Sequence, residues 1–362
     1  EVKGFDPVAL FGAREARKMD RFTQFATAAA VEALAQAGLQ IDESNRDRVG
    51  IVTGTGIGGI GTLLEQANVL RERGPERVSP FLIPMMIADS AAGMLAIRFG
   101  ARGPNMAIST ACASGNNAIG EATEMIRRGA ADAMIVGGSE AAIVPVCMAG
   151  LNVMTALSTR NEGPQSASRP FDKDRDGFVM GEGAGVLILE ALEHAQGRGA
   201  QILCEVSGYG TTDDAHHISA PAENGAGAAL SMKLALENAK LIATDIQYIN
   251  AHGTSTPLND KSETAAIKTV FGEQAYNIPI SSTKSMTGHL LGASGALEAV
   301  ICTLVIREGI LPATINYHTP DLECDLDYVP NQPRKASPKH VMSNSFGFGG
   351  HNATLILSRF EE

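Results

Sequence analysis

The stretch Ile108-Ser-Thr-Ala-Cys112-Ala-Ser-Gly-Asn-Asn-Ala-Ile119 places a cysteine between a short apolar run and a helical pattern that continues to Arg127. A thiol at the start of a helix faces unpaired backbone N–H groups and the positive end of the helix dipole, and both favour the thiolate. The residues around Cys112 are small, which leaves room for a substrate carbonyl. A buried core cysteine is the alternative interpretation. We therefore treat Cys112 as a candidate nucleophile with a lowered pKa.

Strand-like and helix-like segments alternate along the chain. Apolar runs between turn residues predict buried strands, and apolar residues at helical spacing predict helices. This alternation is typical of an α/β architecture with buried sheets. The expected strands cover residues 48–53, 105–108, 133–137, 185–190, 203–209, 248–251, 278–282, 341–345 and 353–357. The expected helices cover residues 20–38, 88–99, 227–240, 260–271 and 293–308.

Two distant segments also resemble each other weakly. Ile108-Ser-Thr is followed by Ser114-Gly and Arg127-Arg-Gly, and Ser281-Ser-Thr is followed by Ser294-Gly and Arg307-Glu-Gly. Each copy pairs a short strand with a helix that ends in a basic residue and then glycine. This internal sequence similarity, which we call the sequence echo, favours a chain of two similar halves over one of two unrelated domains.

Composition limits the classes of partner and compartment. The 362 residues are 44% hydrophobic with a net charge of −11, which argues against nucleic-acid partners and against anionic membranes. No apolar run approaches the length of a membrane span. Five cysteines without a CxxC pair predict a reducing compartment, so we expect a cytosolic protein or the mature form of an organellar one. Eight histidines without HExxH or a Cys/His cluster predict no metal site.

The segment Gly56-Ile-Gly-Gly-Ile-Gly61 matches the GxGxxG pattern of dinucleotide-binding turns and follows an expected strand. No second strand with an acidic ribose ligand follows it, however. Close packing of the backbone beside a strand explains the glycines better. We therefore expect no cofactor, and an oxidoreductase is not favoured.

Two histidines follow other expected strands. His252 lies in Asn250-Ala-His-Gly-Thr-Ser-Thr-Pro257, and His289 lies in Ser281-Ser-Thr-Lys-Ser-Met-Thr-Gly-His289. A single histidine at such a turn is more often structural than catalytic. With Cys112, however, two imidazoles provide the groups that covalent acyl transfer needs. The turn Asn344-Ser-Phe-Gly-Phe-Gly-Gly350 offers backbone N–H groups for an oxyanion hole.

These four motifs, in this order, resemble those of the elongating β-ketoacyl-acyl-carrier-protein synthases, and most closely the type II (KAS II-like) condensing enzymes. The similarity covers nearly the whole chain. It implies an α/β, thiolase-like fold in which duplicated αβαβα halves form a five-layer arrangement, usually as a homodimer. Residues 1–200 would be the half that carries the cysteine, and residues 201–362 the half that carries both histidines.

The resemblance also implies roles for individual residues. Cys112 would take the acyl chain as a thioester, while His252 and His289 would promote malonyl decarboxylation and stabilise the enolate. Lys284 would tune the site electrostatically, and the backbone N–H groups of Cys112 and Phe348 would form the oxyanion hole. Thr254 and Thr256 would contact the pantetheine arm, and Asp260 and Glu298 would support the polar network. Leu151 would line the acyl pocket or the dimer seam, and Ile57 would take another pocket position.

Acyl-carrier protein, in its acyl and malonyl forms, is the implied partner. Arg14, Arg17 and Lys18 match a basic segment that the family places near the carrier-protein entrance. An acidic enzyme that meets an acidic carrier needs such local positive charge. A solvated face is the alternative interpretation of this cluster.

The expected activity is decarboxylative Claisen condensation of malonyl-acyl-carrier protein with a Cys112-bound acyl chain. Alternatives are a polyketide-type ketosynthase, and an inactive fragment or carrier-binding subunit. The Ala113-Ser-Gly-Asn run argues against the first, and the presence of Cys112 argues against a non-catalytic subunit. Family members open with an apolar strand before the point at which this sequence starts, so we expect an unpaired edge in the first sheet.

Overall fold

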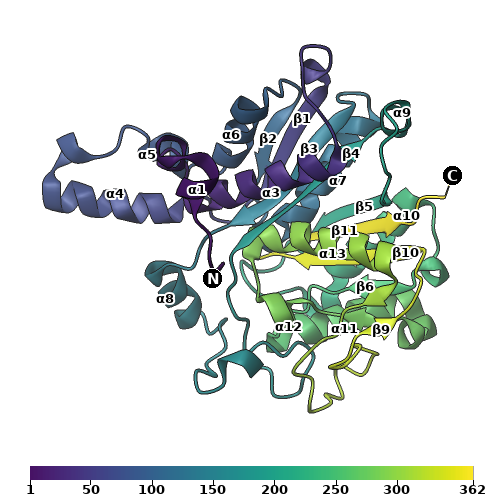
Figure 1. Ribbon diagram of the computed structural model, residues 1–362. Helices are drawn as coiled ribbons and strands as arrows, with labels where there is room; N and C mark the ends of the chain where they lie inside the picture. The colour runs from purple at the N-terminus through teal and green to yellow at the C-terminus, as the bar shows by residue number, and fades with distance from the viewer. Residues whose placement is uncertain (362) are drawn as a thin grey trace.

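Two β-sheets organise the chain in the computed structural model, which describes residues 1–361 (Figure 1). The first sheet has the strand order β2-β1-β3-β4, and the second has the order β5-β11-β10-β6-β7. The strands of the first sheet are β1 (Val49–Gly54), β2 (Asn105–Ile108), β3 (Ala133–Glu140) and β4 (Gly183–Glu190). Those of the second sheet are β5 (Glu205–Asp213), β6 (Tyr248–Asn250), β7 (Ile280–Ser281), β10 (His340–Phe346) and β11 (His351–Ser358). A separate pair is formed by β8 (Ile310–Leu311) and β9 (Arg334–Lys335).

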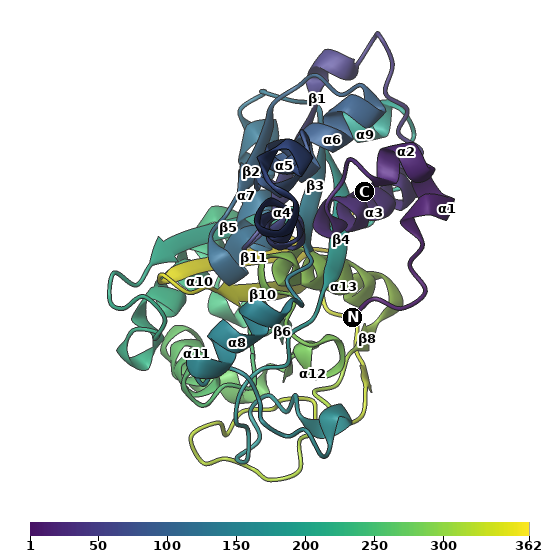
Figure 2. The same ribbon diagram turned by 90° about the vertical axis from the view of Figure 1, so that its left-hand side faces the viewer.

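Helices cover the outer face of each sheet and fill the space between them (Figures 1 and 2). The first sheet is covered by α3 (Arg21–Ala37) and α6 (Ser90–Phe99), and the second by α10 (Ala226–Ala239) and α11 (Pro257–Phe271). Between the sheets lie α7 (Ser114–Arg127) and α13 (Ser294–Glu308). This succession of five layers confirms the fold class expected from the sequence.

The remaining helices are shorter or peripheral. They are α1 (Pro7–Phe11), α2 (Ala13–Ala16), α4 (Ile60–Arg73), α5 (Leu82–Met86), α8 (Pro145–Val153), α9 (Leu192–Gly197) and α12 (Lys284–Thr287). Figure 1 shows α4 projecting from the body of the molecule. Among residues 1–361, no helix has both the length and the apolar character needed to cross a membrane.

The expected elements agree with the structure to within a few residues at most ends, and local chemistry explains several boundaries. Helix α3 begins after Asp20, whose carboxylate accepts from the N–H of Phe22, and ends at Gly38 in the left-handed conformation (φ 61°). Strand β5 continues to Asp213, beyond the expected residue 209. Helix α8 has no counterpart among the expected helices, because its nine residues are mostly apolar and give no periodic pattern.

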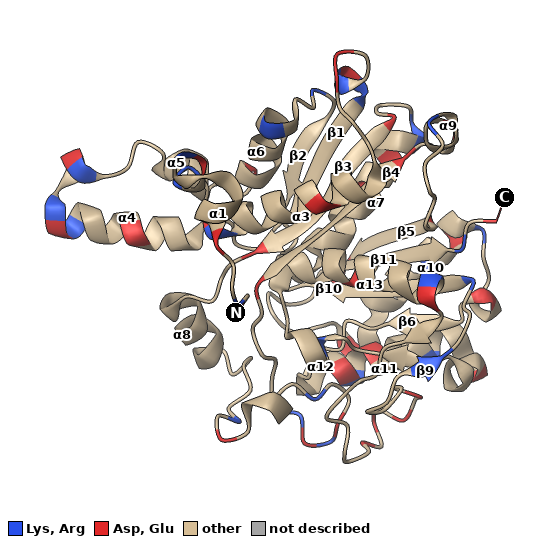
Figure 3. Ribbon diagram, viewed as in Figure 1, with Lys and Arg blue, Asp and Glu red and all other residues tan. Residues whose placement is uncertain are grey.

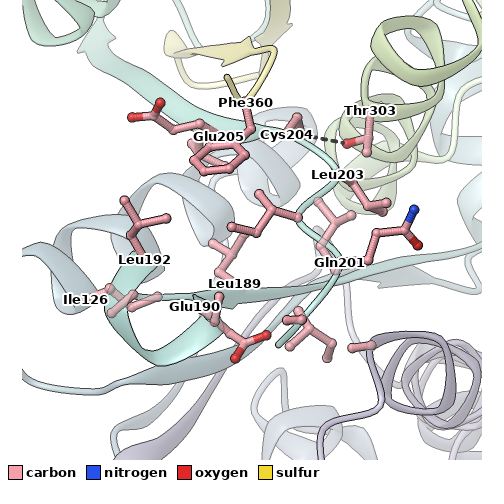
Figure 4. A pocket seen from close by; sticks show the side chains of 18 of the residues that line it. Ile126, Leu189, Glu190, Leu192, Gln201, Leu203, Cys204, Glu205, Thr303 and Phe360 are labelled. Atoms are coloured by element: carbon pink, nitrogen blue, oxygen red, sulfur yellow. Dashed lines mark hydrogen bonds between the residues drawn. The ribbon is translucent and has the colours of Figure 1, made fainter. Parts of the chain in front are cut away.

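Strand β4 ends the first sheet and has no strand beside its outer edge among the described residues. The order β2-β1-β3-β4 corresponds to β7-β6-β10-β11 in the second sheet, which continues with β5. A cavity of about 410 Å³ lies along β4, lined also by side chains of α3, α7 and the segment 200–206 (Figure 4). The two sheets draw their strands from either side of residue 200. The division of the chain into two domains stays a prediction.

Helices α7 and α13 cross in close contact at a pair of glycines. A Cβ atom on Gly115 would lie 2.5 Å from the backbone nitrogen of Ala296, and one on Gly295 would lie 2.8 Å from the backbone nitrogen of Asn116. Both glycines follow a serine at equivalent places in the sequence echo. Since neither has a side chain, the helices approach backbone to backbone, and their N-terminal ends meet in the middle layer.

The substitution Gly115→Ala should lower the free energy of unfolding by about 1–3 kcal/mol, because the added methyl group overlaps a backbone atom of α13. Gly93 in α6 is the matched control, since a Cβ there meets no heavy atom within 4 Å. Gly93→Ala should stabilise the protein by about 0.5–1 kcal/mol, as alanine does in helix interiors. Urea unfolding measures both variants, and equal stability of the two would contradict the close crossing.

Candidate active site

Cys112 lies in the 3-10 turn Ala111–Ala113, which connects β2 to α7. The preceding Ala111 adopts φ 48°, a left-handed conformation that turns the chain sharply. A second turn of the same kind, Leu291–Ala293, precedes α13, and Leu291 has φ 49°. The two turns pack against each other where the helices cross. The fold therefore places Cys112 beside the segment that carries His289.

Cys112, His252 and His289 meet at this point. The sulfur and one ring nitrogen of each histidine lie within 4.8 Å of one another, and all three residues are buried. Nε2 of His289 is 3.1 Å from Sγ of Cys112, and its Nδ1 is 2.9 Å from Oγ of Ser294. The two imidazole rings are nearly perpendicular, with centroids 5.3 Å apart. The sequence shows no Cys/His cluster, but the fold assembles one from three distant segments.

The protonation of this cluster differs from the expectation for Cys112. Burial raises the pKa of the thiol to about 11, although the charge of Lys284 and the backbone N–H of Phe348 act in the opposite direction. The prediction that the thiol pKa is lowered is wrong. Desolvation of the buried sulfur raises this pKa by more than the N–H groups and dipole at the start of the helix lower it. Burial, together with Lys284, holds the pKa of His252 and of His289 well below the usual range. At neutral pH the proton therefore rests on sulfur, and both imidazoles are neutral.

Lys284 and Glu298 form a buried ion pair behind the cluster. Nζ of Lys284 lies 2.6 Å from Oε1 of Glu298, and the two side chains are 1% and 2% exposed. Burial raises the pKa of Glu298 to about 7, against the opposing effect of Lys284. Figure 3 shows most charged residues on outer helices and loops, so this interior pair is unusual. The positive charge of Lys284 reaches all three members of the cluster.

Two buried glutamates that we did not single out from the sequence also shape the site. Glu263 accepts from the N–H groups of His252 and Gly253, both at 2.8 Å, and thereby fixes the backbone that carries the histidine. Burial raises the pKa of Glu263 to about 7. Glu263 lies on α11, eleven residues after His252. The sequence pattern of a helix does not reveal that this carboxylate points back to the end of the preceding strand.

Glu140, at the end of β3, holds the glycine-rich turn Gly56–Gly61 in place. Its carboxylate accepts from the N–H groups of Gly56 and Ile57 and from that of Gly292, at 2.7, 3.2 and 3.0 Å. The backbone donors that would cradle a phosphate are thus occupied by a side chain of the same protein. Glu140 thus connects the turn to the segment before α13, and the turn is not free to bind a dinucleotide.

The other expected site residues lie at different distances from the cluster. Thr254 and Thr256 line the same cavity as Cys112, with their hydroxyl oxygens 2.9 Å apart. Asp260 does not line it; its carboxylate accepts from the N–H groups of Ser255 and Phe171 and so fixes the loop that carries the threonines.

The cavity that contains the cluster has a volume of about 310 Å³, and Phe348 forms part of its wall. Neither Ile57 nor Leu151 lines this cavity. Ile57 is 40% exposed, and Leu151 packs against the apolar cluster that includes Cys112. Their roles in the acyl pocket or the dimer seam stay predictions.

The basic cluster lies away from this cavity in the single chain. Arg14, Arg17 and Lys18 are absent from its lining, and Lys18 pairs with Glu15 at 2.9 Å. Figure 2 shows α1 and α2 on the right of the molecule, whereas α8, α10 and α11 lie on the left. The use of this cluster in carrier-protein docking stays a prediction.

The rate at which iodoacetamide alkylates Cys112 should rise roughly tenfold per pH unit between pH 7 and 10, because only the small thiolate fraction reacts. Lys284 favours the thiolate, so Lys284→Met combined with Glu298→Gln should move the profile to higher pH. Mass spectrometry of the Cys112 peptide measures the rate, with N-acetylcysteine as reference. A plateau below pH 8 would contradict the raised pKa.

Comparison with known proteins agrees with this geometry. The family description "Beta-ketoacyl synthase, N-terminal domain" matches residues 1–195, and "Beta-ketoacyl synthase, C-terminal domain" matches residues 203–318. The 3-oxoacyl-[acyl-carrier-protein] synthase 2 of Synechocystis sp. is 54% identical over 361 residues, and that of Staphylococcus aureus strain COL is 52% identical. Both alignments cover 100% of this chain and 87% of the relative.

Solved structures give the same result. A β-ketoacyl synthase from Burkholderia phymatum has a TM-score of 0.92 at 38% identity, over 99% of this chain and 87% of its own. A ketosynthase complexed with its type II polyketide acyl-carrier protein has a TM-score of 0.89 at 38% identity, over 94% and 85%. The paired sheets, the Cys-His-His cluster and these similarities lead to one conclusion: this chain belongs to the β-ketoacyl synthase family.

Proposed function

We propose that this protein is an acyltransferase that condenses malonyl-acyl-carrier protein with a Cys112-bound acyl chain, in the elongation of fatty acids. The products are carbon dioxide and a 3-oxoacyl-acyl-carrier protein two carbons longer. The observation that carries the proposal is the contact of 3.1 Å between Cys112 Sγ and His289 Nε2, with His252 beside them in the wall of one cavity.

The first half-reaction loads the acyl chain onto Cys112. As the sulfur attacks the thioester carbonyl, its proton passes to the neutral Nε2 of His289, and an oxyanion forms. The backbone N–H groups of Cys112 and Phe348, which already act on the sulfur, are the donors for that oxyanion. The pantetheine thiolate leaves and takes the proton. Thr254 and Thr256 contact its arm at the cavity wall.

The second half-reaction joins the malonyl unit. Before this step the ring proton of His289 exchanges from Nδ1 to Nε2 through solvent, and Ser294 Oγ then donates to Nδ1. The N–H groups of the neutral imidazoles of His252 and His289 donate to the malonyl thioester oxygen, which gains charge as carbon dioxide departs. The resulting enolate carbon attacks the Cys112 thioester, and the released thiolate of Cys112 takes a proton from solvent, which restores the resting thiol. Lys284 adds positive charge near both steps while Glu298 keeps its ammonium paired. The low imidazole pKa values suit this role, since both rings must stay neutral donors.

A polyketide-type ketosynthase is the second candidate, because the ketosynthase of a type II polyketide system has a similar fold at 38% identity. The fatty-acid synthases are nearer in sequence, at 52–54% identity over the full chain. The two functions differ in their products. A product extended by one two-carbon unit, a 3-oxoacyl-acyl-carrier protein, indicates fatty-acid elongation. A product extended several times without reduction of its keto groups indicates polyketide synthesis.

Incubation with acyl-acyl-carrier protein should give one acyl adduct on Cys112, and malonyl-acyl-carrier protein should then discharge it as a product two carbons longer. The variants His252→Ala and His289→Ala should lower condensation about 10²-fold or more, because each removes a donor to the enolate oxygen. Intact-protein mass spectrometry and product analysis measure both steps. Cys147→Ser is the matched control. Cys147 packs against the apolar cluster that includes Cys112, but it is not one of the three cluster residues Cys112, His252 and His289. A folded protein that forms no adduct would be a carrier-binding subunit instead.

The proposed carrier-docking role of the basic cluster has its own test. Reversing the charges of Arg14, Arg17 and Lys18 to glutamate should raise the KM for acyl-carrier protein, mostly at low ionic strength, and leave kcat little changed. The control is Arg307→Glu together with Lys335→Glu, which alters exposed charges on other elements. Equal KM values for the two sets would show that the cluster is only a solvated face.

Homodimer assembly is part of the same proposal. Exposed apolar side chains lie on the edge strand β2 (Met106), on the projecting helix α4 (Leu70), and at the start of α5 (Phe81 and Ile83). Apolar side chains exposed on a sheet edge and on a projecting helix suit an interface. The cytosolic location and the positions of Ile57 and Leu151 in the acyl pocket also stay predictions.

A further inference from the structure

The Cys112, His252 and His289 cluster has a property that acyl transfer does not use. A thiolate sulfur and two imidazole nitrogens are a donor set typical of Zn²⁺ sites with one open position. Zinc bonds of about 2.0 Å to nitrogen and 2.3 Å to sulfur place tetrahedral donors about 3.3–3.5 Å apart. The Cys112–His289 pair is already at 3.1 Å, and the widest pair, within 4.8 Å, needs to close by no more than about 1.5 Å. We propose that this cluster binds one Zn²⁺ ion, with water in the fourth position.

The surroundings of the two histidines support a ligand site. Nδ1 of His289 lies 2.9 Å from Oγ of Ser294, a contact that orients the ring and directs Nε2 toward the sulfur. His252 is 2% exposed, yet its Nδ1 has no hydrogen-bond partner among the described residues. An unpaired polar atom at such depth is costly, and no hydrogen bond of Nδ1 holds the ring when it moves toward an ion.

Access and charge are also compatible with the ion. All three donors line the cavity of about 310 Å³, so an aqueous cation reaches them. Lys284 opposes a cation, but its ammonium is paired with Glu298 at 2.6 Å. Binding replaces the S–H bond of Cys112 with an S–Zn bond and releases one proton to solvent. The ion adds two positive charges and the released proton removes one, so the net charge of the site rises by one unit.

Zinc at this position blocks the sulfur that takes the acyl chain. The consequence for activity, reversible inhibition competitive with the acyl donor, rests on the proposed function. The binding itself does not, because it depends only on the three donors. Metal binding and condensation are therefore measured separately.

In the first measurement, the whole chain is titrated with Co²⁺, because the absorption spectrum of bound Co²⁺ depends on its ligands. One equivalent should give a thiolate-to-cobalt charge-transfer band and the visible bands of a tetrahedral site, and Zn²⁺ should displace both. In parallel, one equivalent of Zn²⁺ should slow alkylation of Cys112 by iodoacetamide at least tenfold, and a chelator should restore the rate. This second readout uses the unmodified protein and needs no variant to fold.

Variants identify the donors. Cys112→Ser should abolish the charge-transfer band, and His252→Ala and His289→Ala should each weaken Zn²⁺ binding by about tenfold or more. Cys147→Ser, a neighbouring cysteine outside the cluster, and His217→Ala, an exposed histidine, should bind as the unmodified chain does. Zinc binding retained in Cys112→Ser, or Cys112 alkylation unaffected by Zn²⁺, would overturn the proposal.

Discussion

The close crossing of α7 and α13 is the constraint on which the rest of the structure depends. Gly115 and Gly295 let the two backbones touch, so the turns before each helix also meet. One turn holds Cys112, and the other directly follows His289. A side chain in place of either glycine would overlap the facing backbone and separate these turns. Glu140 reinforces the same junction, because its carboxylate binds N–H groups of both halves.

Burial at this junction determines the protonation of the site. A carboxylate, an ammonium or a thiolate there loses most of its hydration, so charge persists only where a partner is in contact, as for Lys284 and Glu298. The thiol and imidazoles have no such partner and stay neutral at rest. The nucleophile is thus formed by proton transfer during attack. This differs from cysteine enzymes that store a thiolate–imidazolium pair.

Sequence patterns predicted the layered α/β fold, because the buried strands are short apolar runs between turns and the long helices are periodic. They also singled out Cys112, His252 and His289, since each follows a strand end. They failed where three-dimensional contact decides the property. The pKa of Cys112 depends on desolvation by residues far along the chain, and Glu263 and Glu140 act through backbone donors that no side-chain pattern records. Helix α8 lacked a periodic signal.

The separation of 177 residues between Cys112 and His289 has a consequence for biosynthesis. While the first half is being translated, α7 has no α13 to pack against, and its apolar face stays exposed until about 180 further residues, up to the end of α13, have been added. The reactive pair therefore does not exist in the nascent chain. Contacts of such long sequence separation close slowly, so the apolar face of α7 is most open to non-native contacts in the interval before α13 arrives.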